Sequence, residues 1–141
     1  MPWTHIILHH SLTADGIVVN SSAIRRYHIE HNGWNDIGYH FLVEKATRRN
    51  DYEVILGRTL DKPGAHTKGM NRCAIGICIV GNYDLVSPEP EMFERLVPVL
   101  KWLRKEYKIP LDNIKGHRDY ANKSCPGDNF SVEEVINFLR K

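Results

Sequence analysis

The sequence has 141 residues, of which 42% are hydrophobic and 26% charged, and its formal net charge is +2. Length and composition are typical of one globular domain with a single buried core. So small a net charge gives no support to a nucleic-acid surface, and no apolar run approaches the roughly 20 residues that cross a bilayer. We therefore expect one domain over residues 1–141, with no nucleic-acid partner and no membrane span.

The first segments of the chain predict a strand followed by a helix. Residues 5–9 (HIILH) form an apolar run that is typical of a strand. Asn20 or Ser21 can cap a helix, and Gly33 is a suitable residue to end it. The helical spacing predicts four inward positions: Ile24, Tyr27, His28 and His31.

The middle of the chain has three β-type runs. Residues 39–44 (YHFLVE) and 53–56 (EVIL) are separated by the polar stretch KATRRND, which predicts an antiparallel hairpin. Residues 73–80 (CAIGICIV) are almost all apolar, as in a strand that is buried on both faces. Both of its cysteines are expected to be core residues, and Gly76 and Gly81 are expected to allow close packing.

The last third of the chain is mainly helical. Residues 87–107 predict a long helix that Pro98 should bend, with an apolar inner stripe: Met92, Phe93, Leu96, Val97, Leu100 and Leu103. A last short strand is expected to end at Ile114. Ser131 then caps a terminal helix, and Glu134 completes a capping box. Together these elements predict an α/β fold with a central mixed β-sheet flanked by helices.

A histidine and a cysteine stand eight positions apart in KGHRDYANKSCPG (115–127). An imidazole and a thiolate are a suitable zinc pair, and His9 or His10 at the end of the first strand can supply a third ligand to His117 and Cys125. Such a set leaves one tetrahedral position for water, as in catalytic zinc sites. The spacing alone is a weak signal, because most pairs of this kind bind no metal.

Five segments, in this order, resemble the zinc-dependent N-acetylmuramoyl-L-alanine amidases, a family that includes short phage lysozymes and animal peptidoglycan-recognition proteins. The resemblance implies a mixed sheet flanked by helices, a Zn²⁺ cofactor and bacterial peptidoglycan as substrate. The reaction implied is hydrolysis of the amide between the lactyl group of N-acetylmuramic acid and the L-alanine of the stem peptide. The segments are IILHHS (6–11), GWNDIGYHFLV (33–43), GRTLDKPGAHTKGMN (57–71), AIGICIVGNYD (74–84) and GHRDYANKSCPG (116–127).

The resemblance implies that His9, His117 and Cys125 are the zinc ligands. His9 is preferred over His10 because the family's ligand directly follows the apolar strand residues. Strand alternation gives this choice weak support, since two adjacent strand residues point to opposite faces. His10 is then expected to pack or to form hydrogen bonds.

The resemblance also implies the residues that act beside the metal. Amide hydrolysis needs a stabilised oxyanion and a proton for the leaving amine. Lys123 is expected to stabilise the oxyanion, and Tyr39 to donate a proton or orient water. His66, Trp34 and Asn71 are expected to contact the substrate. Without the resemblance, Tyr39 would be interpreted as a strand residue and Lys123 as a solvated loop residue.

The expected setting is a phage or prophage endolysin. The start of the chain lacks the basic and long apolar regions of a signal peptide, so we expect synthesis in the cytoplasm and release to the cell wall by a partner such as a holin. A monomer is expected. Two alternatives stay open: a muropeptide-recognition module without catalysis, and a regulatory protein that binds RNA polymerase. In non-catalytic recognition proteins another residue, often serine, stands where this chain has Cys125.

Overall fold

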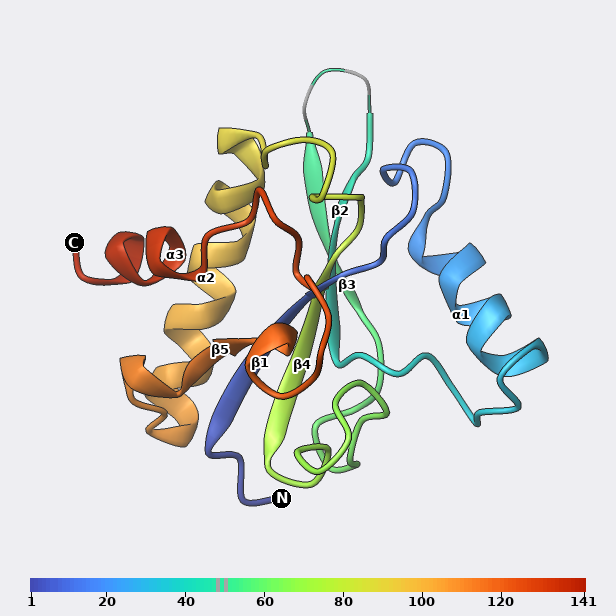
Figure 1. Cartoon of the computed structure of the whole chain (residues 1–141). Coiled ribbons are helices and arrows are strands. Elements are labelled where there is room, and N and C mark those ends of the chain that lie inside the picture. The colour runs from blue at the N-terminus through green and yellow to red at the C-terminus, as the bar shows by residue number, and fades with distance from the viewer. Residues whose placement is uncertain (48, 50) are drawn as a thin grey trace.

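A five-stranded mixed sheet forms the centre of the molecule in the computed structural model, which describes residues 1–47, 49 and 51–141 (Figure 1). The strand order is β3-β2-β4-β1-β5, in which β3 is antiparallel to β2 and the other neighbours are parallel. The predicted mixed sheet and hairpin are confirmed, although Arg48 and Asn50 of the hairpin connection lie outside the described residues. The strands are β1 (His5–His10), β2 (Phe41–Lys45), β3 (Tyr52–Leu56), β4 (Ala74–Ile79) and β5 (Ile114–Gly116).

Helices cover both faces of this sheet. The long helix α2 and the terminal helix α3 pack together on one face, and α1 lies on the opposite side (Figure 1). The helices are α1 (Ser21–Glu30), α2 (Pro90–Tyr107) and α3 (Val132–Leu139), and two 3₁₀ turns, η1 (Leu111–Asn113) and η2 (His117–Asp119), flank β5. None of the helices in the described part of the chain has the length and apolar character needed to span a bilayer.

The two faces of the sheet have cores of very different size. The face under α2 and α3 carries the larger apolar cluster, to which Ile6 and Leu8 of β1 belong. Because successive strand residues point to opposite faces, His9 projects toward the side of α1. That side has a small cluster, made of Ile24, Ile37, Leu42, Cys78 and Val80. The thinner core leaves room for cavities beside His9.

Helix α1 differs from the sequence prediction in its buried face. Asn20 is the N-cap, and its side chain accepts a hydrogen bond from Ala23 N. Ile24 is buried, but Tyr27 is 55% exposed and His31 is also exposed, so the inward stripe was wrong at these two positions. The physical reason is that α1 stands away from the sheet over a cavity that its side chains do not fill.

The other predicted elements agree with the structure in type, and their ends shift by a few residues. The inner stripe of α2 is buried except for the half-buried Val97. Ile114 begins the last strand instead of ending it. Ser131 caps α3 by accepting a hydrogen bond from Glu134 N. Cys78 is a core residue as predicted, whereas Cys73 precedes β4 and is only half-buried.

Candidate metal centre

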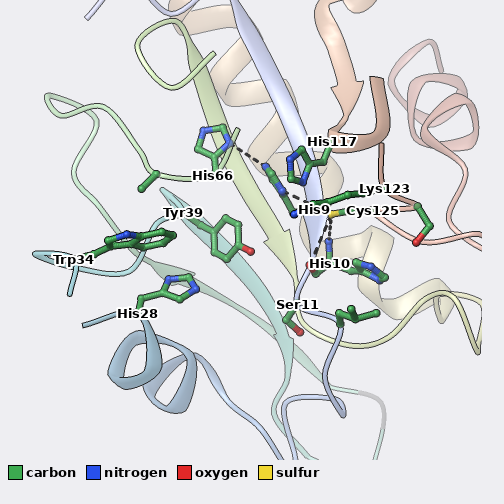
Figure 2. Close-up of a pocket in the computed structure, with 13 residues that line it drawn as sticks. His9, His10, Ser11, His28, Trp34, Tyr39, His66, His117, Lys123 and Cys125 are labelled. Carbon is green, nitrogen blue, oxygen red and sulfur yellow. Dashed lines mark hydrogen bonds between the residues drawn. The ribbon is translucent and has the colours of Figure 1, made fainter. Parts of the chain in front are cut away.

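Two parallel strands and one loop bring a metal-ligating group together. In β1 and β5, Leu8 pairs with Gly116, so the residues that follow, His9 and His117, lie side by side. Cys125 reaches them from the loop after η2. One ligand atom from each of the three lies within 4.8 Å of the others, and His9 Nδ1 is 3.7 Å from Cys125 Sγ (Figure 2).

The distance between His9 and Cys125 fits a tetrahedral metal ion. Zn–N bonds near 2.1 Å and Zn–S bonds near 2.3 Å place nitrogen and sulfur ligands about 3.6 Å apart at a tetrahedral angle. The observed 3.7 Å between His9 Nδ1 and Cys125 Sγ matches that separation. Three side-chain ligands that border a cavity leave a fourth position facing it. The group can therefore hold a metal ion with one open site.

Burial sets the charge of the three ligands. It lowers the pKa of His9 well below its ordinary value, and the neighbouring His66 and His117 lower it further. Burial also lowers the pKa of His117. It raises the pKa of the Cys125 thiol to about 11, although the hydrogen bond that His10 N donates to Sγ acts in the opposite direction and lowers this pKa. The imidazoles are thus neutral and ready to ligate, and a metal ion must displace the thiol proton.

A hydrogen-bond chain fixes which nitrogen of His9 faces the ligand group. Ala74 O can only accept, so His66 Nε2, 3.0 Å away, carries the proton. Since burial holds the pKa of His66 at about 3, the ring is neutral and its Nδ1 accepts. His9 Nε2, 2.9 Å from that Nδ1 and 3.2 Å from Thr67 Oγ1, therefore donates. The lone pair of His9 Nδ1 is left to point at Cys125, as a metal ligand requires.

His10 has a different environment from His9. Its Nδ1 accepts a hydrogen bond of 3.1 Å from Tyr83 N, and its ring packs against that of Tyr83. His10 is therefore held by Tyr83, which belongs to the larger apolar cluster, while His9 belongs to the ligand group.

A cavity of about 520 Å³ opens in front of the ligand group. Figure 2 shows Trp34, Tyr39 and His28 on one side of it and His117, Lys123 and Cys125 on the other. The predicted site residues that line it are His9, Trp34, Tyr39, His66, His117, Lys123 and Cys125. Burial raises the pKa of Tyr39 well above its ordinary value, so its hydroxyl keeps its proton.

Asn71 is the predicted site residue that is not among the described residues lining this cavity. Its Oδ1 accepts hydrogen bonds of 2.9 Å from His66 N and Thr67 N. The amide thus supports the turn that carries the two partners of His9, and substrate contact by Asn71 stays a prediction. Thr67 was not predicted, although it follows His66 directly in the sequence.

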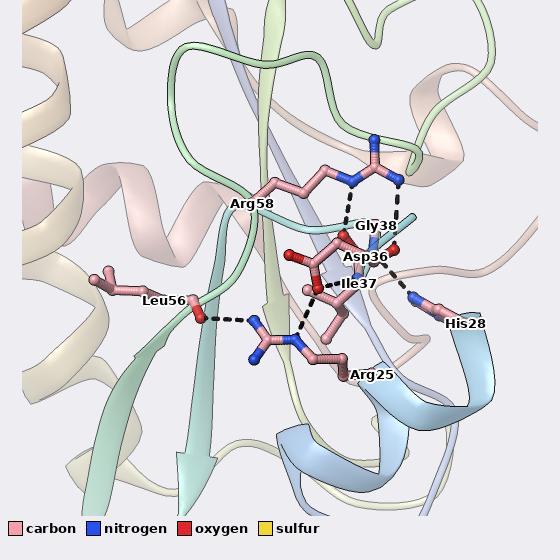
Figure 3. A network of polar contacts seen from close by, with 7 residues as sticks. All are labelled: Arg25, His28, Asp36, Ile37, Gly38, Leu56 and Arg58. Atoms are coloured by element: carbon pink, nitrogen blue, oxygen red, sulfur yellow. Dashed lines mark hydrogen bonds and ion pairs between the residues drawn. The ribbon is translucent and has the colours of Figure 1, made fainter. Parts of the chain in front are cut away.

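His28 is a cavity residue that the sequence pattern assigned only to a helix face. Gly38 N donates a hydrogen bond of 3.0 Å to His28 Nδ1, so Nε2 is the second polar atom of this ring at the cavity wall. Burial lowers the pKa of the His28 imidazole. Arg25 forms an ion pair of 2.8 Å with Asp36 and donates to Leu56 O (Figure 3). This network holds α1, and with it His28, at the cavity wall despite the small apolar core.

Opposite charges hold the loop that carries Cys125. Asp84 accepts from Ser124 Oγ at 3.0 Å and from Asp128 N at 2.9 Å, so one carboxylate binds the loop on both sides of Cys125. Arg118 donates to loop carbonyls, namely those of Ser124, Gly127 and Phe130. The Asp84 carboxylate accepts hydrogen bonds from donors of the loop, and the Arg118 guanidinium donates to carbonyl oxygens of the loop. These bonds fix the loop although it has no regular secondary structure.

A mixed sheet whose cavity combines a group that could hold a metal ion with a protonated tyrosine and a lysine is the kind of site that metal-dependent hydrolases have. Residues 1–128 match the family described as N-acetylmuramoyl-L-alanine amidase. The chain belongs to this family, and the resemblance found in its sequence is confirmed.

Individual relatives and solved structures agree with this assignment. The endolysin of Enterobacteria phage K11 is 38% identical over 87% of this chain and 80% of its own. The human N-acetylmuramoyl-L-alanine amidase is 34% identical over 77% of this chain and 18% of its own. The structure of the amidase LysC from Clostridium intestinale covers 99% of this chain and 87% of its own, with 28% identity and a TM-score of 0.84. Bumblebee peptidoglycan-recognition protein SA covers 99% and 83%, with 28% identity and a TM-score of 0.82. The expected fold is confirmed.

Proposed function

We propose that the protein is a zinc-dependent N-acetylmuramoyl-L-alanine amidase with one catalytic domain. It hydrolyses the amide between the lactyl carbonyl of N-acetylmuramic acid and the L-alanine of the peptidoglycan stem. The observation that carries the proposal is the convergence of His9, His117 and Cys125 on the cavity that Tyr39 and Lys123 also line. Membership of the amidase family supports the choice of substrate.

Zn²⁺ is the metal that this donor set favours, because two imidazoles and one thiolate suit its tetrahedral coordination. When bound, zinc supplies a Lewis acid for the scissile carbonyl and lowers the pKa of coordinated water. The protein's own contribution begins with His66 and Thr67, which hold His9 in the tautomer that directs Nδ1 to the metal. Asp84 contributes from the other side by positioning the Cys125 loop.

Two cavity residues carry the proposed acid–base and electrostatic roles. The ammonium group of Lys123, an exposed side chain that lines the cavity, stabilises the negative charge that develops on the carbonyl oxygen during attack. Its charge lies close enough to the ligand group to lower the pKa of His9 and of His117. The Tyr39 hydroxyl, which keeps its proton, donates toward the departing alanine nitrogen. Trp34, His66 and His28 form the walls against which the glycopeptide lies.

The proposal is tested by Cys125→Ser with Cys73→Ser as the matched control. Cys73 is a free, half-buried thiol that is not among the described residues lining the cavity. Wild type and Cys73→Ser should hold about one zinc per chain and release stem peptide from purified cell wall. Cys125→Ser should lose the zinc and at least about 100-fold in turnover, since a coordinating ligand is removed. Undiminished turnover in Cys125→Ser would reject the assignment.

The setting we propose is that of a phage or prophage endolysin, made in the cytoplasm and released to the wall by a holin. Support comes from the similarity to phage endolysins. A monomer belongs to the same proposal, and a regulatory protein that contacts a phage RNA polymerase is a further alternative. Size-exclusion chromatography with light scattering tests the first, and a pull-down from phage-infected cells tests the second.

A muropeptide-recognition module without catalysis is the alternative, since recognition proteins have the same fold. The presence of Cys125 in the ligand group favours catalysis. A protein that binds muropeptide but contains no zinc and cuts nothing would establish the alternative.

A further inference from the structure

The catalytic cavity continues into a second cavity beneath helix α1. The second has a volume of about 420 Å³ and shares Ser11, Leu12, His28 and Tyr39 with the first. Its remaining walls are apolar or neutral, and no Asp, Glu, Lys or Arg side chain is among the described residues that line it. A substrate at the ligand group can therefore extend into a groove suited to alkyl groups.

Leu12 stands where the two cavities meet, in a conformation that leucine rarely adopts. Its side chain is 59% exposed, and its backbone φ of 57° lies in the left-handed region. Among the described residues other than glycine, positive φ is found elsewhere at Lys108, the C-cap of α2, where this conformation is common. Leu12 lies between β1 and α1 and is not a helix C-cap, so helix capping does not explain its left-handed backbone.

The two neighbours of Leu12 enforce this conformation. Ser11 Oγ accepts a hydrogen bond of 2.9 Å from Gly81 N, and Thr13 N donates one of 3.3 Å to Gly81 O. The hydroxyls of Ser11 and Thr13 are also 2.7 Å apart. Because both neighbours bind the same residue of the β4–α2 connection, the chain between them must turn outward. Strain that is held in this way beside a catalytic cavity points to a functional side chain.

We propose that Leu12 determines specificity by packing against the methyl group of L-alanine, the first residue of the stem peptide. The inference rests on the proposed amidase function, which places the scissile amide at the ligand group. A sugar has hydroxyl and acetamido groups that need polar partners, whereas the α1 cavity offers mostly apolar walls. The peptide side of the scissile bond therefore runs past Leu12, and alanine is the residue next to that bond.

The test compares two soluble muramyl peptides that differ only in L-alanine or glycine at the first stem position. One methyl group in an apolar site is worth about 10-fold, so wild type should prefer the alanine substrate by roughly that factor in kcat/KM. Leu12→Gly removes the wall and relieves the strain. It should bring the preference close to 1 and raise the Tm, a combination that loss of a purely structural side chain does not give.

Two further variants act as controls. Leu12→Met keeps an apolar wall and should keep the preference for alanine. Val18→Ala trims another exposed apolar residue of the same loop, 75% exposed and not among the described residues that line either cavity, and should keep it too.

The inference is overturned if Leu12→Gly retains the wild-type preference, or loses rate equally on both substrates. A wild-type protein that cleaves neither peptide nor purified wall would instead reject the amidase function, so the two failures are distinguishable.

Discussion

The absence of a side chain at Gly76 is what allows His66 to reach His9. A Cβ at this position of β4 would lie 2.4 Å from His66 Cδ2, 2.6 Å from Cγ and 2.7 Å from Nε2. Carbon atoms pack at about 3.5–4.0 Å, so the imidazole of a Gly76→Ala variant must move by about 1 Å. The prediction that Gly76 serves close packing is confirmed.

The cost of Gly76→Ala can be estimated from the contacts of the displaced ring. Overpacking in a close-packed core costs about 1–3 kcal/mol. The ring also bonds Ala74 O at 3.0 Å and His9 Nε2 at 2.9 Å, and weakening both adds about 1–2 kcal/mol. The lower chain entropy of alanine in the unfolded state offsets about 0.5–1 kcal/mol. We expect a net loss of about 1–4.5 kcal/mol in the free energy of unfolding, and a metal affinity that is about 10–100-fold weaker.

Urea denaturation of four proteins measures this effect: wild type, Gly76→Ala, His66→Ala and the double variant. In the His66→Ala background the ring is gone, so Gly76→Ala should change the free energy of unfolding by less than about 1 kcal/mol. The coupling between the two positions should therefore exceed about 1 kcal/mol. An equal cost of Gly76→Ala in both backgrounds, or no cost in wild type, would refute the reasoning.

Two further predictions concern the ligand loop and the proton donor. Asp84→Ala should weaken zinc binding about 10–100-fold in a competition assay with a chromophoric chelator, because the loop donors around Cys125 lose their acceptor; Asp112→Ala, in the turn before β5, should bind zinc like wild type. Tyr39→Phe should lower kcat about 10²–10⁴-fold with little change in KM. Because burial raises the pKa of Tyr39 well above its ordinary value of 10, the hydroxyl is protonated at pH 7 and at pH 9. The variant's loss should be equal at the two pH values, and a smaller loss at pH 9 would contradict the assigned role.

The sequence by itself determined the type of most elements and the three residues of the ligand group. Apolar runs predicted β1 and β4, and the spacing of apolar residues predicted α2. These predictions were possible because the buried face of a strand or helix appears as a regular spacing of apolar residues within the segment itself. Five segments in family order named His9, His117 and Cys125, and parallel pairing of β1 with β5 then brings the two histidines together. Their role as zinc ligands is the prediction that the metal analysis of Cys125→Ser tests.

Tertiary structure alone decided how these residues are held. Asp84 binds a loop 40 residues away in sequence, and His66 orients a histidine 57 residues away. The left-handed turn at Leu12 depends on hydrogen bonds between its neighbours and Gly81, which lies far along the chain. The exposure of Tyr27 on α1 likewise depends on the cavity that separates this helix from the sheet. Local periodicity reports which side chains can be buried, but a hydrogen bond between distant segments exists only once the sheet has set their separation.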